Sequence, residues 1–329
     1  MMRYILSPST NCYWNLALEQ YVFDNLDTDY GYFMLWQNDN TIVVGKHQNT
    51  AAEINAEYVK ENDIKVVRRL SGGGAVYHDL GNLNYTFIDD NPDDTFDFAR
   101  FCNPVVKALA SLGANAEITG RNDMTLDGKK FSGNAMYKKK GRVMHHGTLM
   151  FDSNLDILTN ALKVSKDKIE SKGIKSIRSR VTNIKPHIND DLTVQDFIVA
   201  LRDFMFSENE MEVYELTDED IKNVDKLYEE VYSKWEWNYG ASPKYSVMKE
   251  RRIEGFGKLE VYMDVKSGKI EDISFYGDYF GNGDSSVLAE IMKGKNLEET
   301  ELRTALKDVD IRHYFNNLSL DQFMSIIME

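Results

Sequence analysis

Three consecutive glycines preceded by two arginines form the most distinctive chemical pattern in this sequence. The segment reads RRLSGGGAVYHD over residues 68–79, and the apolar runs on its two sides predict one strand before it and one after it. Because glycine has no Cβ, an anion can approach the backbone N–H groups of such a turn, and arginine suits bidentate contact with phosphate. The segment therefore predicts a phosphate- or carboxylate-binding turn; the alternative is a flexible hairpin loop with incidental arginines.

A lysine could act on an anion held there. The segments GRND (residues 120–123) and KFSGNA (residues 130–135) follow one another, and Lys130 stands at the start of a predicted strand beside Ser-Gly. Its ammonium group can point into a cleft as a movable positive charge, although exposed surface lysines give the same pattern. Alternation along the strand puts only one of Lys129 and Lys130 in the cleft, and we expect it to be Lys130.

Two more segments carry polar side chains of interest. HHGTL (residues 145–149) lies on a predicted strand, where alternation turns one of the two histidines inward. SIRSRVTN (residues 176–183) is a basic, hydroxyl-rich loop that could wrap a nucleotide. The ordinary alternatives are a core histidine and a surface loop.

Common nucleotide and hydrolase motifs are absent. The sequence has no G-x-x-x-x-G-K-[ST], H-E-x-x-H or G-x-S-x-G, and Gly255-Phe-Gly257 lacks a third glycine at dinucleotide-binding spacing. Its two cysteines, Cys12 and Cys102, cannot build a disulfide framework or a zinc cluster.

Composition indicates a globular protein with a substantial core. The 329 residues are 42% hydrophobic and 28% charged, with a net charge of −14. Because no apolar run approaches the roughly 18 residues that span a bilayer and the start has no signal-peptide pattern, the cytoplasm is the expected location. The acidity argues against nucleic-acid and membrane partners. However, residues 129–146 contain six Lys or Arg and no Asp or Glu, so a small polyanion could bind there.

Periodicity predicts an α+β chain with mixed or antiparallel sheets. The expected helices are 14–23, 50–62, 96–113, 154–163, 193–206, 217–234, 285–293, 297–308 and 318–328. The expected strands are 32–36, 41–45, 64–68, 75–78, 82–88, 116–118, 123–126, 130–137, 142–151, 256–265 and 269–276. A change of composition near Trp235 and a linker at Ala241-Ser-Pro243 predict domains of residues 1–240 and 241–329.

Together these motifs resemble those of the lipoate–protein ligase A family, of the single-chain type with a C-terminal accessory domain. The five segments RRLSGGGAVYHD, GRND, KFSGNA, HHGTL and KSIRSRVTN, with the smaller matches WNLA (14–17), LW (35–36) and WEWN (235–238), fall in the family's order over essentially the whole chain. The resemblance implies a biotin/lipoate ligase-like catalytic domain, with a mixed β-sheet and flanking helices, and a small α+β accessory domain.

The resemblance also implies the activity. Such enzymes use ATP and Mg²⁺ to convert lipoate or octanoate to an acyl-AMP, releasing pyrophosphate, and then transfer the acyl group to a lysine of an acceptor lipoyl domain. The implied acceptors are the acyltransferase subunits of 2-oxoacid dehydrogenase complexes, the glycine-cleavage H protein, or both. A monomer is expected, as is a swing of the small domain between the two reactions.

By motif position, the resemblance implies a set of site residues. Lys130 matches the catalytic lysine, and Asp123 is the expected metal ligand. His78 and His146 are expected near the lipoyl group or its carbonyl. The expected cofactor-binding residues are Arg69, Ser71, Gly72, Gly73, Gly74, Ala75, Val76, Tyr77, His78, Asn122, Asp123, Lys130, His146, Gly147, Thr148 and Arg180. Candidates for the apolar slot of the lipoyl tail are Trp36, Val43 and Val44.

Other functions remain open at this point. A lipoyl or octanoyl transferase of the same fold would act through a cysteine thioester without ATP, which requires an activated thiol near the site. A biotin ligase would be expected to carry a Gly-Arg-Gly-Arg-type loop in place of Ser-Gly-Gly-Gly. A non-catalytic lipoate-binding protein would form no product with ATP. The choice of acyl chain and acceptor, and the group that takes the proton from the acceptor lysine, are also left open.

Overall fold

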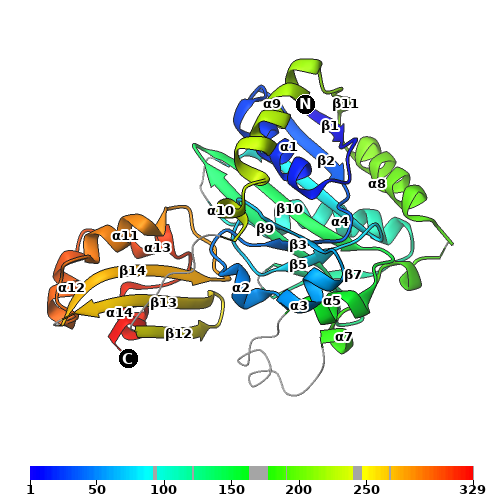
Figure 1. Ribbon diagram of the computed structural model, residues 1–329. Helices are drawn as coiled ribbons and strands as arrows, with labels where there is room; N and C mark the ends of the chain where they lie inside the picture. The colour runs from blue at the N-terminus through cyan, green and yellow to red at the C-terminus, as the bar shows by residue number, and fades with distance from the viewer. Residues whose placement is uncertain are drawn as a thin grey trace.

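The chain forms two units, each with its own hydrophobic core (Figure 1). The structure, a computed structural model, describes residues 1–91, 95–120, 122–162, 177–189, 191–239, 247–266 and 268–328. An eight-stranded mixed sheet organises the larger unit, and a three-stranded antiparallel sheet organises the smaller one. The predicted α+β class, with a mixed-sheet domain and a small accessory domain, is confirmed.

The strands are β1 (Met2–Leu6), β2 (Gly31–Trp36), β3 (Thr41–Val44), β4 (Lys65–Arg68), β5 (Val76–His78), β6 (Asn82–Asp90), β7 (Ala116–Thr119), β8 (Asp123–Leu126), β9 (Lys129–Lys139), β10 (Arg142–Met150), β11 (Met211–Val213), β12 (Val247–Ile253), β13 (Gly257–Lys266) and β14 (Lys269–Gly277). The helices are α1 (Cys12–Asn25), α2 (Thr50–Glu53), α3 (Ala56–Glu61), α4 (Phe98–Ser111), α5 (Leu155–Ala161), α7 (Ile177–Arg180), η1 (Lys185–His187), α8 (Val194–Glu208), α9 (Asp218–Leu227), η2 (Tyr228–Tyr232), α10 (Trp235–Asn238), α11 (Ser285–Met292), α12 (Glu299–Ala305), α13 (Ile311–Tyr314) and α14 (Leu320–Met328).

The large sheet brings motifs together that are far apart in the sequence. Its order is β11-β1-β2-β6-β10-β9-β8-β7, and only the β11–β1 and β1–β2 pairs are parallel. β8, β9 and β10 are joined by two tight turns, Asp127-Gly128 and Lys140-Gly141, whose residues all have positive φ, as the favoured two-residue hairpin turns require. The register of β9 and β10 sets Asn134 opposite Gly147, so KFSGNA and HHGTL lie side by side.

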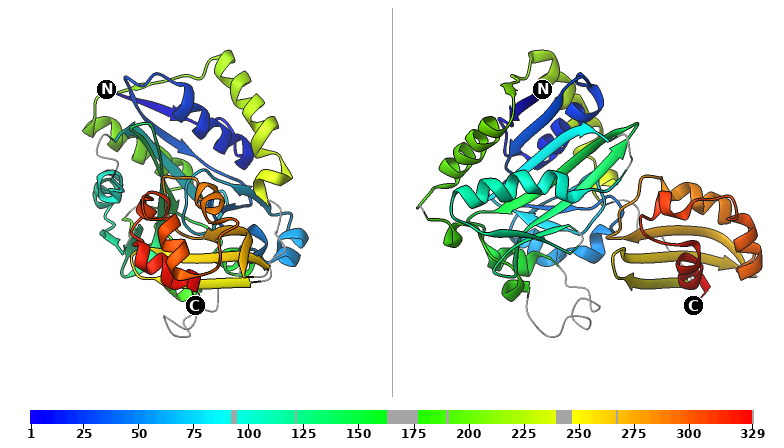
Figure 2. Two further views of the ribbon diagram at one scale, coloured as in Figure 1. Left: turned by 90° about the vertical axis from the view of Figure 1, so that its left-hand side faces the viewer. Right: turned by 180° about the vertical axis from the view of Figure 1, so that it is seen from behind.

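Helices cover both faces of this sheet (Figures 1 and 2). α1 and α9 pack on one face, in a core that includes Leu16, Trp36 and Val224. α4 and α8 pack on the other face, around Val105 and Phe197. Asn11 caps α1, because its side chain accepts a hydrogen bond from the N–H of Tyr13 at 3.0 Å.

A second small sheet carries the three glycines. Its order is β4-β3-β5, with β3 parallel to β4 and antiparallel to β5. Residues 71–74, called the glycine turn below, connect β4 to β5. The turn is therefore held at both ends by strands that pair with β3.

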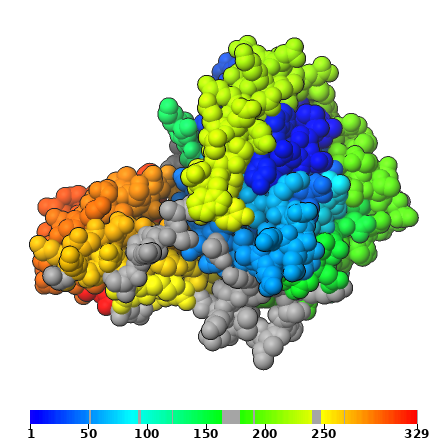
Figure 3. Space-filling view, in the orientation of Figure 1, coloured from blue at the N-terminus to red at the C-terminus, as the bar shows by residue number. Residues whose placement is uncertain are grey.

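The accessory domain docks against the larger unit (Figures 2 and 3), where its residue Tyr279 contacts the glycine turn. Phe280 is 2% exposed and packs in the catalytic core, with ring centroids 5.9 Å from Phe96 and 5.4 Å from Phe98. The N–H of Gly73 donates to the carbonyl oxygen of Tyr279 at 3.3 Å. Burying one phenylalanine side chain contributes about 2–3 kcal/mol, so this contact stabilises the docked arrangement.

Some expected boundaries were wrong. The helix expected over 50–62 is divided into α2 and α3, because Ile54 leaves the helix to form a bridge with Leu162 and Asn55 caps α3. β1, β11, β12 and α13 were missed, since they are short or, in β12, rich in charged residues. The linker expected at 241–243 lies outside the described residues.

No helix within the described part of the chain is long and apolar enough to cross a bilayer.

Candidate active site

A cavity of about 790 Å³ lies where the glycine turn, the β8–β10 strands and the accessory domain meet. This volume is in the range of small-molecule sites. The lining residues come from all three regions: Leu16, Trp36, Val43, Arg69, Gly73, Gly74, Ala75, Val76, His78, Asn84, Gly120, Asn122, Asp123, Lys130, Gly133, Asn134, Ala135, His146, Gly147, Thr148, Arg252, Ile253, Glu254, Gly255, Gly257 and Asp278. Aromatic and aliphatic side chains therefore share one space with cationic and amide groups.

Lys130 lies in this cavity, paired with Asp123. Its Nζ is 2.7 Å from Oδ1 of Asp123, and the two side chains are 37% and 39% exposed. An ion pair this exposed contributes about 0–1 kcal/mol, so the ammonium group can exchange the carboxylate for another anion at little cost. A Cβ at Gly133 would stand 3.0 Å from the Lys130 Nζ, so this glycine leaves room for the lysine side chain. Lys129, at the exposed start of β9, does not line the cavity.

Arg69 holds the glycine turn in shape through hydrogen bonds to residues of the turn. Its guanidinium donates to the carbonyl oxygens of Val43, Gly72 and Gly74, at 3.2, 2.7 and 2.8 Å, and to Oγ of Ser71 at 3.0 Å. Burial lowers the pKa of Arg69 to about 10, which still leaves it charged at neutral pH. Its main contacts are thus with protein carbonyls, while part of the side chain borders the cavity.

The guanidinium of Arg68 binds protein groups and has a structural role. Its guanidinium donates to the carbonyl oxygens of Gly45 and Gln48 and to Oγ1 of Thr50, each at 2.7 or 2.8 Å. Its Nε donates to the carbonyl oxygen of Trp237 at 2.9 Å, so it also holds α10. The expectation that both arginines supply charge at the entrance of the turn is therefore wrong for Arg68, which does not line the cavity.

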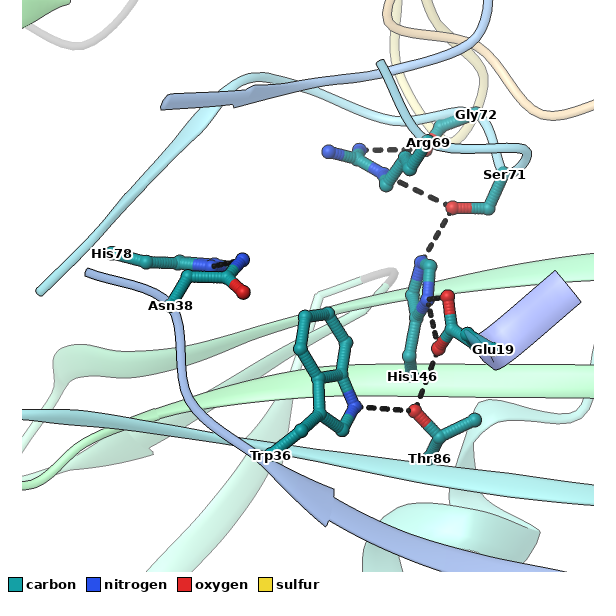
Figure 4. Close-up of polar contacts among 9 residues, drawn as sticks. All are labelled: Glu19, Trp36, Asn38, Arg69, Ser71, Gly72, His78, Thr86 and His146. Atoms are coloured by element: carbon teal, nitrogen blue, oxygen red, sulfur yellow. Dashed lines mark hydrogen bonds and ion pairs between the residues drawn. The ribbon is translucent and has the colours of Figure 1, made fainter. Parts of the chain in front are cut away.

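His146 belongs to a buried hydrogen-bonded chain (Figure 4). Its Nε2 lies 2.6 Å from Oγ of Ser71, and its Nδ1 lies 2.8 and 2.9 Å from the two carboxylate oxygens of Glu19. Oγ1 of Thr86 donates to the same carboxylate at 2.6 Å, and Nε1 of Trp36 donates to Thr86 at 2.9 Å. The chain links the glycine turn to the apolar part of the cavity.

His78 and His145 have surroundings that differ from those of His146. His78 lines the cavity, and burial lowers its pKa to about 3, so its imidazole is neutral. His145 points into the opposite core, stacked on Phe101 at 5.1 Å, and its pKa also lies well below the ordinary value because of burial. Alternation along β10 therefore places His146, and not His145, at the cavity.

Most of the predicted site residues line the cavity, and four do not. Ser71 lies beneath it, bonded to His146, and Gly72 faces the accessory domain, where a Cβ would stand 2.2 Å from the carbonyl oxygen of Tyr279. Tyr77 points away and donates to Oδ1 of Asn40 at 3.0 Å. Arg180 ends α7, next to the segment that pairs with Lys130.

The apolar slot was predicted in part. Trp36 and Val43 line the cavity, whereas Val44 points to the other side of β3, into a core with Ile42. Glu19 was missed because a single acidic residue in a helix gives no sequence signal. The accessory-domain residues of the wall, from Arg252 to Asp278, were missed because only docking brings them there.

Both cysteines are buried and outside the cavity lining. Burial raises the pKa of Cys12 to about 11 and that of Cys102 to about 12. These thiols are therefore protonated at neutral pH and poor nucleophiles.

Carboxylates do not cluster in the described parts of the chain as they would in a metal site built from protein ligands alone. No group of three or more His, Cys, Asp or Glu side chains there could hold a metal ion. Asp123 is one carboxylate at the cavity that could share a cation with a bound anion.

Comparisons with known proteins fit this geometry. A family model described as "Lipoyl protein ligase A/B catalytic domain" matches residues 11–206, and one described as "Bacterial lipoate protein ligase C-terminus" matches residues 242–327. The chain is similar to the lipoate-protein ligase LplJ of Bacillus subtilis, with 47% identity over 317 residues that cover 95% of this chain and 96% of that protein.

Three solved structures are similar as well. The P. falciparum LipL1 in complex with lipoate has a TM-score of 0.81 and 26% identity, covering 100% of this chain and 99% of that one. A lipoate-protein ligase A bound with ATP has a TM-score of 0.63 and 26% identity, covering 73% and 98%. A bipartite lipoate protein ligase of Thermoplasma acidophilum, described with its E2 lipoyl domain, has a TM-score of 0.63 and 28% identity, covering 75% and 98%.

Proposed function

This chain belongs to the lipoate–protein ligase family, and from that premise we propose a role for each of its site residues. It is an ATP-dependent ligase that activates lipoate or octanoate to an acyl-AMP, releasing pyrophosphate, and then transfers the acyl group to a lysine of an acceptor lipoyl domain. The observation that carries the assignment of roles is a movable ammonium group, that of Lys130, in a cavity that also has an apolar wall.

Lys130 is the catalytic residue of this proposal. Attack of a carboxylate on the α-phosphate of ATP brings two anions together, so positive charge must be supplied between them. When substrates bind, the Lys130 ammonium leaves Asp123 and contacts both the carboxylate and the α-phosphate, stabilising the charge that develops as pyrophosphate leaves. Holding both substrates in one cavity supplies much of the remaining rate.

The glycine turn and the neighbouring strands bind the nucleotide. A Cβ at Gly74 would meet no heavy atom within 4 Å, so the turn leaves open space for a phosphate at this position. Arg69 holds the turn in shape through its carbonyl contacts and adds a buried positive charge. Asn122, Gly147 and Thr148 border the same space. Arg180, the last residue of α7, would close over the adenylate.

Magnesium fits this donor set as a companion of ATP. Mg²⁺ is commonly held by one or two carboxylates together with substrate phosphates and water, and Asp123 offers one such carboxylate at the cavity. The ion would supply Lewis-acid stabilisation of the phosphate charges, with Asp123 released from Lys130 as its protein ligand.

The acceptors of the proposal are the lipoyl domains of 2-oxoacid dehydrogenase acyltransferase subunits, the glycine-cleavage H protein, or both. The E2 lipoyl domain described with the T. acidophilum ligase supports the first class. We also propose that the enzyme works as a monomer and that the accessory domain leaves its docked position between the two reactions.

Intact mass of an apo lipoyl domain tests the function. The domain is incubated with the enzyme and lipoate, with and without Mg-ATP, and a lipoyl mass gain is expected only with ATP. A gain from a lipoylated donor protein without ATP would identify a transferase instead. The buried, protonated Cys12 and Cys102 do not favour that reaction.

A further inference from the structure

His78, a residue of the cavity wall, has one ring nitrogen without a hydrogen-bond partner in the described part of the chain. The residue is 2% exposed and lines the cavity, and its ring centroid lies 6.3 Å from that of Trp36. Its Nε2 is buried and has no hydrogen-bond partner in the described part of the chain. In Figure 4 the imidazole extends toward the space between Arg69 and Trp36. A buried polar atom at a cavity wall is a candidate contact for a ligand.

A relay of two buried asparagines reaches His78 from the side away from Nε2. Nδ2 of Asn15 lies 2.7 Å from the carbonyl oxygen of Gln37 and 3.1 Å from that of Ser9. Because a carbonyl oxygen can only accept, the orientation of the Asn15 amide is fixed. The same Nδ2 lies 2.9 Å from Oδ1 of Asn38, so Asn38 turns its own Nδ2 toward His78.

This relay determines which nitrogen of His78 carries the proton. Nδ2 of Asn38 lies 3.2 Å from Nδ1 of His78, and an amide nitrogen can only donate. Burial, with smaller effects of Arg69 and His146, lowers the pKa of His78 to about 3, so the ring is neutral. Nδ1 of His78 therefore accepts, and the single ring proton lies on Nε2, the nitrogen not bonded to Asn38.

We propose that Asn38 is a positioning residue that holds His78 as its Nε2–H tautomer, so that this N–H donates a hydrogen bond to a carboxylate oxygen of the acyl substrate. The inference rests on the proposed function, because it assigns a substrate contact within the same cavity. It specifies the contact made by His78, already an expected cofactor-binding residue, and assigns a role to Asn38, which is not itself part of the cavity lining.

The acyl carboxylate suits this donor better than a phosphate does. His78 lies beside Trp36, an apolar wall residue, whereas the open glycine turn serves the more highly charged phosphates and Lys130 contacts both groups. An uncharged N–H donor can bind the carboxylate before activation and the uncharged acyl carbonyl after it. A cationic group would bind the charged carboxylate more tightly than the uncharged acyl carbonyl.

Asn38→Asp separates this role from simple packing, because the side chain keeps its shape and changes only its hydrogen-bonding character. The carboxylate introduced by this substitution would accept at Nδ1 of His78, so the neutral ring would carry its proton there and turn a lone pair toward the acyl carboxylate. Only the imidazolium form would still have an Nε2–H. The new negative charge raises the pKa of His78 in the variant, so the contact is present at low pH and lost as pH rises through that pKa.

The experiment measures lipoate-dependent ATP–pyrophosphate exchange by the full-length enzyme between about pH 6 and about pH 9. At about pH 9, we expect the KM for lipoate of Asn38→Asp to exceed that of the wild type by about 10- to 100-fold. This excess should become smaller as the pH is lowered toward about 6. The KM for ATP should stay within about twofold of the wild-type value. Asn115→Asp makes the same charge change in an exposed loop outside the cavity and should match the wild type.

His78→Gln and His78→Ala provide a second arm that does not depend on Asn38. Glutamine can keep an N–H donor near the position of Nε2, so His78→Gln should retain more of the lipoate affinity than His78→Ala. Nitrogen NMR of the wild type should show His78 protonated on Nε2. Protonation on Nδ1, a KM increase for ATP instead of lipoate, or a pH-independent loss in Asn38→Asp would each overturn the proposal. An inactive wild type would overturn the proposed function, and this role with it.

Discussion

Oγ of Ser71 and Nε2 of His146 lie 2.6 Å apart, and this hydrogen bond ties the glycine turn to β10. Arg69 donates to the same Oγ, and Glu19 binds the other nitrogen of His146. Two buried groups of opposite charge are thus connected through one serine and one histidine. The position of the turn, and with it the shape of the cavity, depends on this connection.

Loss of the Ser71 hydroxyl should therefore weaken the fold. Ser71→Ala leaves Nε of Arg69 and Nε2 of His146 without this partner in a buried place, which costs about 1–3 kcal/mol. Urea denaturation measures the free energy of unfolding. Ser207→Ala removes an exposed hydroxyl on α8 and should change that free energy by less than about 0.5 kcal/mol. Equal effects of the two substitutions would contradict the structural role of Ser71.

Lys130 and Lys129 should differ sharply in catalysis. Lys130→Ala removes the movable charge from the cavity and should lower the rate of lipoyl-AMP formation by about 100-fold or more. Lys129→Ala changes an exposed residue at the start of β9 and should leave the rate near that of the wild type. Trapping of radioactive lipoyl-AMP measures both. Normal adenylate formation by Lys130→Ala, with its loss in Lys129→Ala, would reverse the assignment.

Acid should destabilise the protein partly through His145. Burial depresses the pKa of this histidine in the folded state well below 6.5. The unfolded chain therefore binds a proton that the folded chain does not, so stability is full above about pH 6.5 and falls as pH decreases below it.

His145→Phe removes this proton uptake. Its free energy of unfolding should fall less steeply between about pH 6.5 and about pH 5, by up to about 1.4 kcal/mol per pH unit. His313→Gln, on the exposed surface of the accessory domain, should keep the wild-type slope. The comparison uses urea denaturation at several pH values, and an unchanged slope in His145→Phe would refute the assignment.

Release of the accessory domain should be visible at its docking contact. The N–H of Gly73, which a phosphate could use, now donates to Tyr279, and Phe280 fills the adjoining core. We expect a stable analogue of lipoyl-AMP to change the distance between spin labels placed on α8 and α12. A label pair within the catalytic unit, on α8 and α9, serves as the control. The same interdomain distance in the free and analogue-bound protein would contradict the swing.

Phe280→Ala should loosen docking in the free enzyme. It removes about 3–5 kcal/mol of packing from the contact with Phe96 and Phe98. The distribution of distances between the labels on α8 and α12 should therefore broaden even without the analogue. Phe204→Ala, on α8, tests whether loss of a partly buried phenylalanine elsewhere has the same effect. Broadening confined to Phe280→Ala would support docking through this residue.

Local patterns singled out the segments of the site, and the resemblance to the lipoate–protein ligase A family assigned their roles. The triple glycine, the start of β9 and the paired histidines identified segments that line one cavity, because each element is short and its side chains alternate. The same alternation distinguished Lys130 from Lys129. The α+β class followed from hydrophobic periodicity.

Tertiary packing decided the rest. A sequence cannot tell whether an arginine meets phosphate or protein carbonyls, and folding commits Arg68 entirely to carbonyls and hydroxyls. Glu19 acquires its role only when α1 packs against β10, and Asn38 only when the segment after β2 packs against β5. Arg252 reaches the cavity only when the accessory domain docks. The physical reason is that hydrogen-bond partners and burial depend on residues distant in the chain, whereas alternation and turn chemistry depend on neighbours.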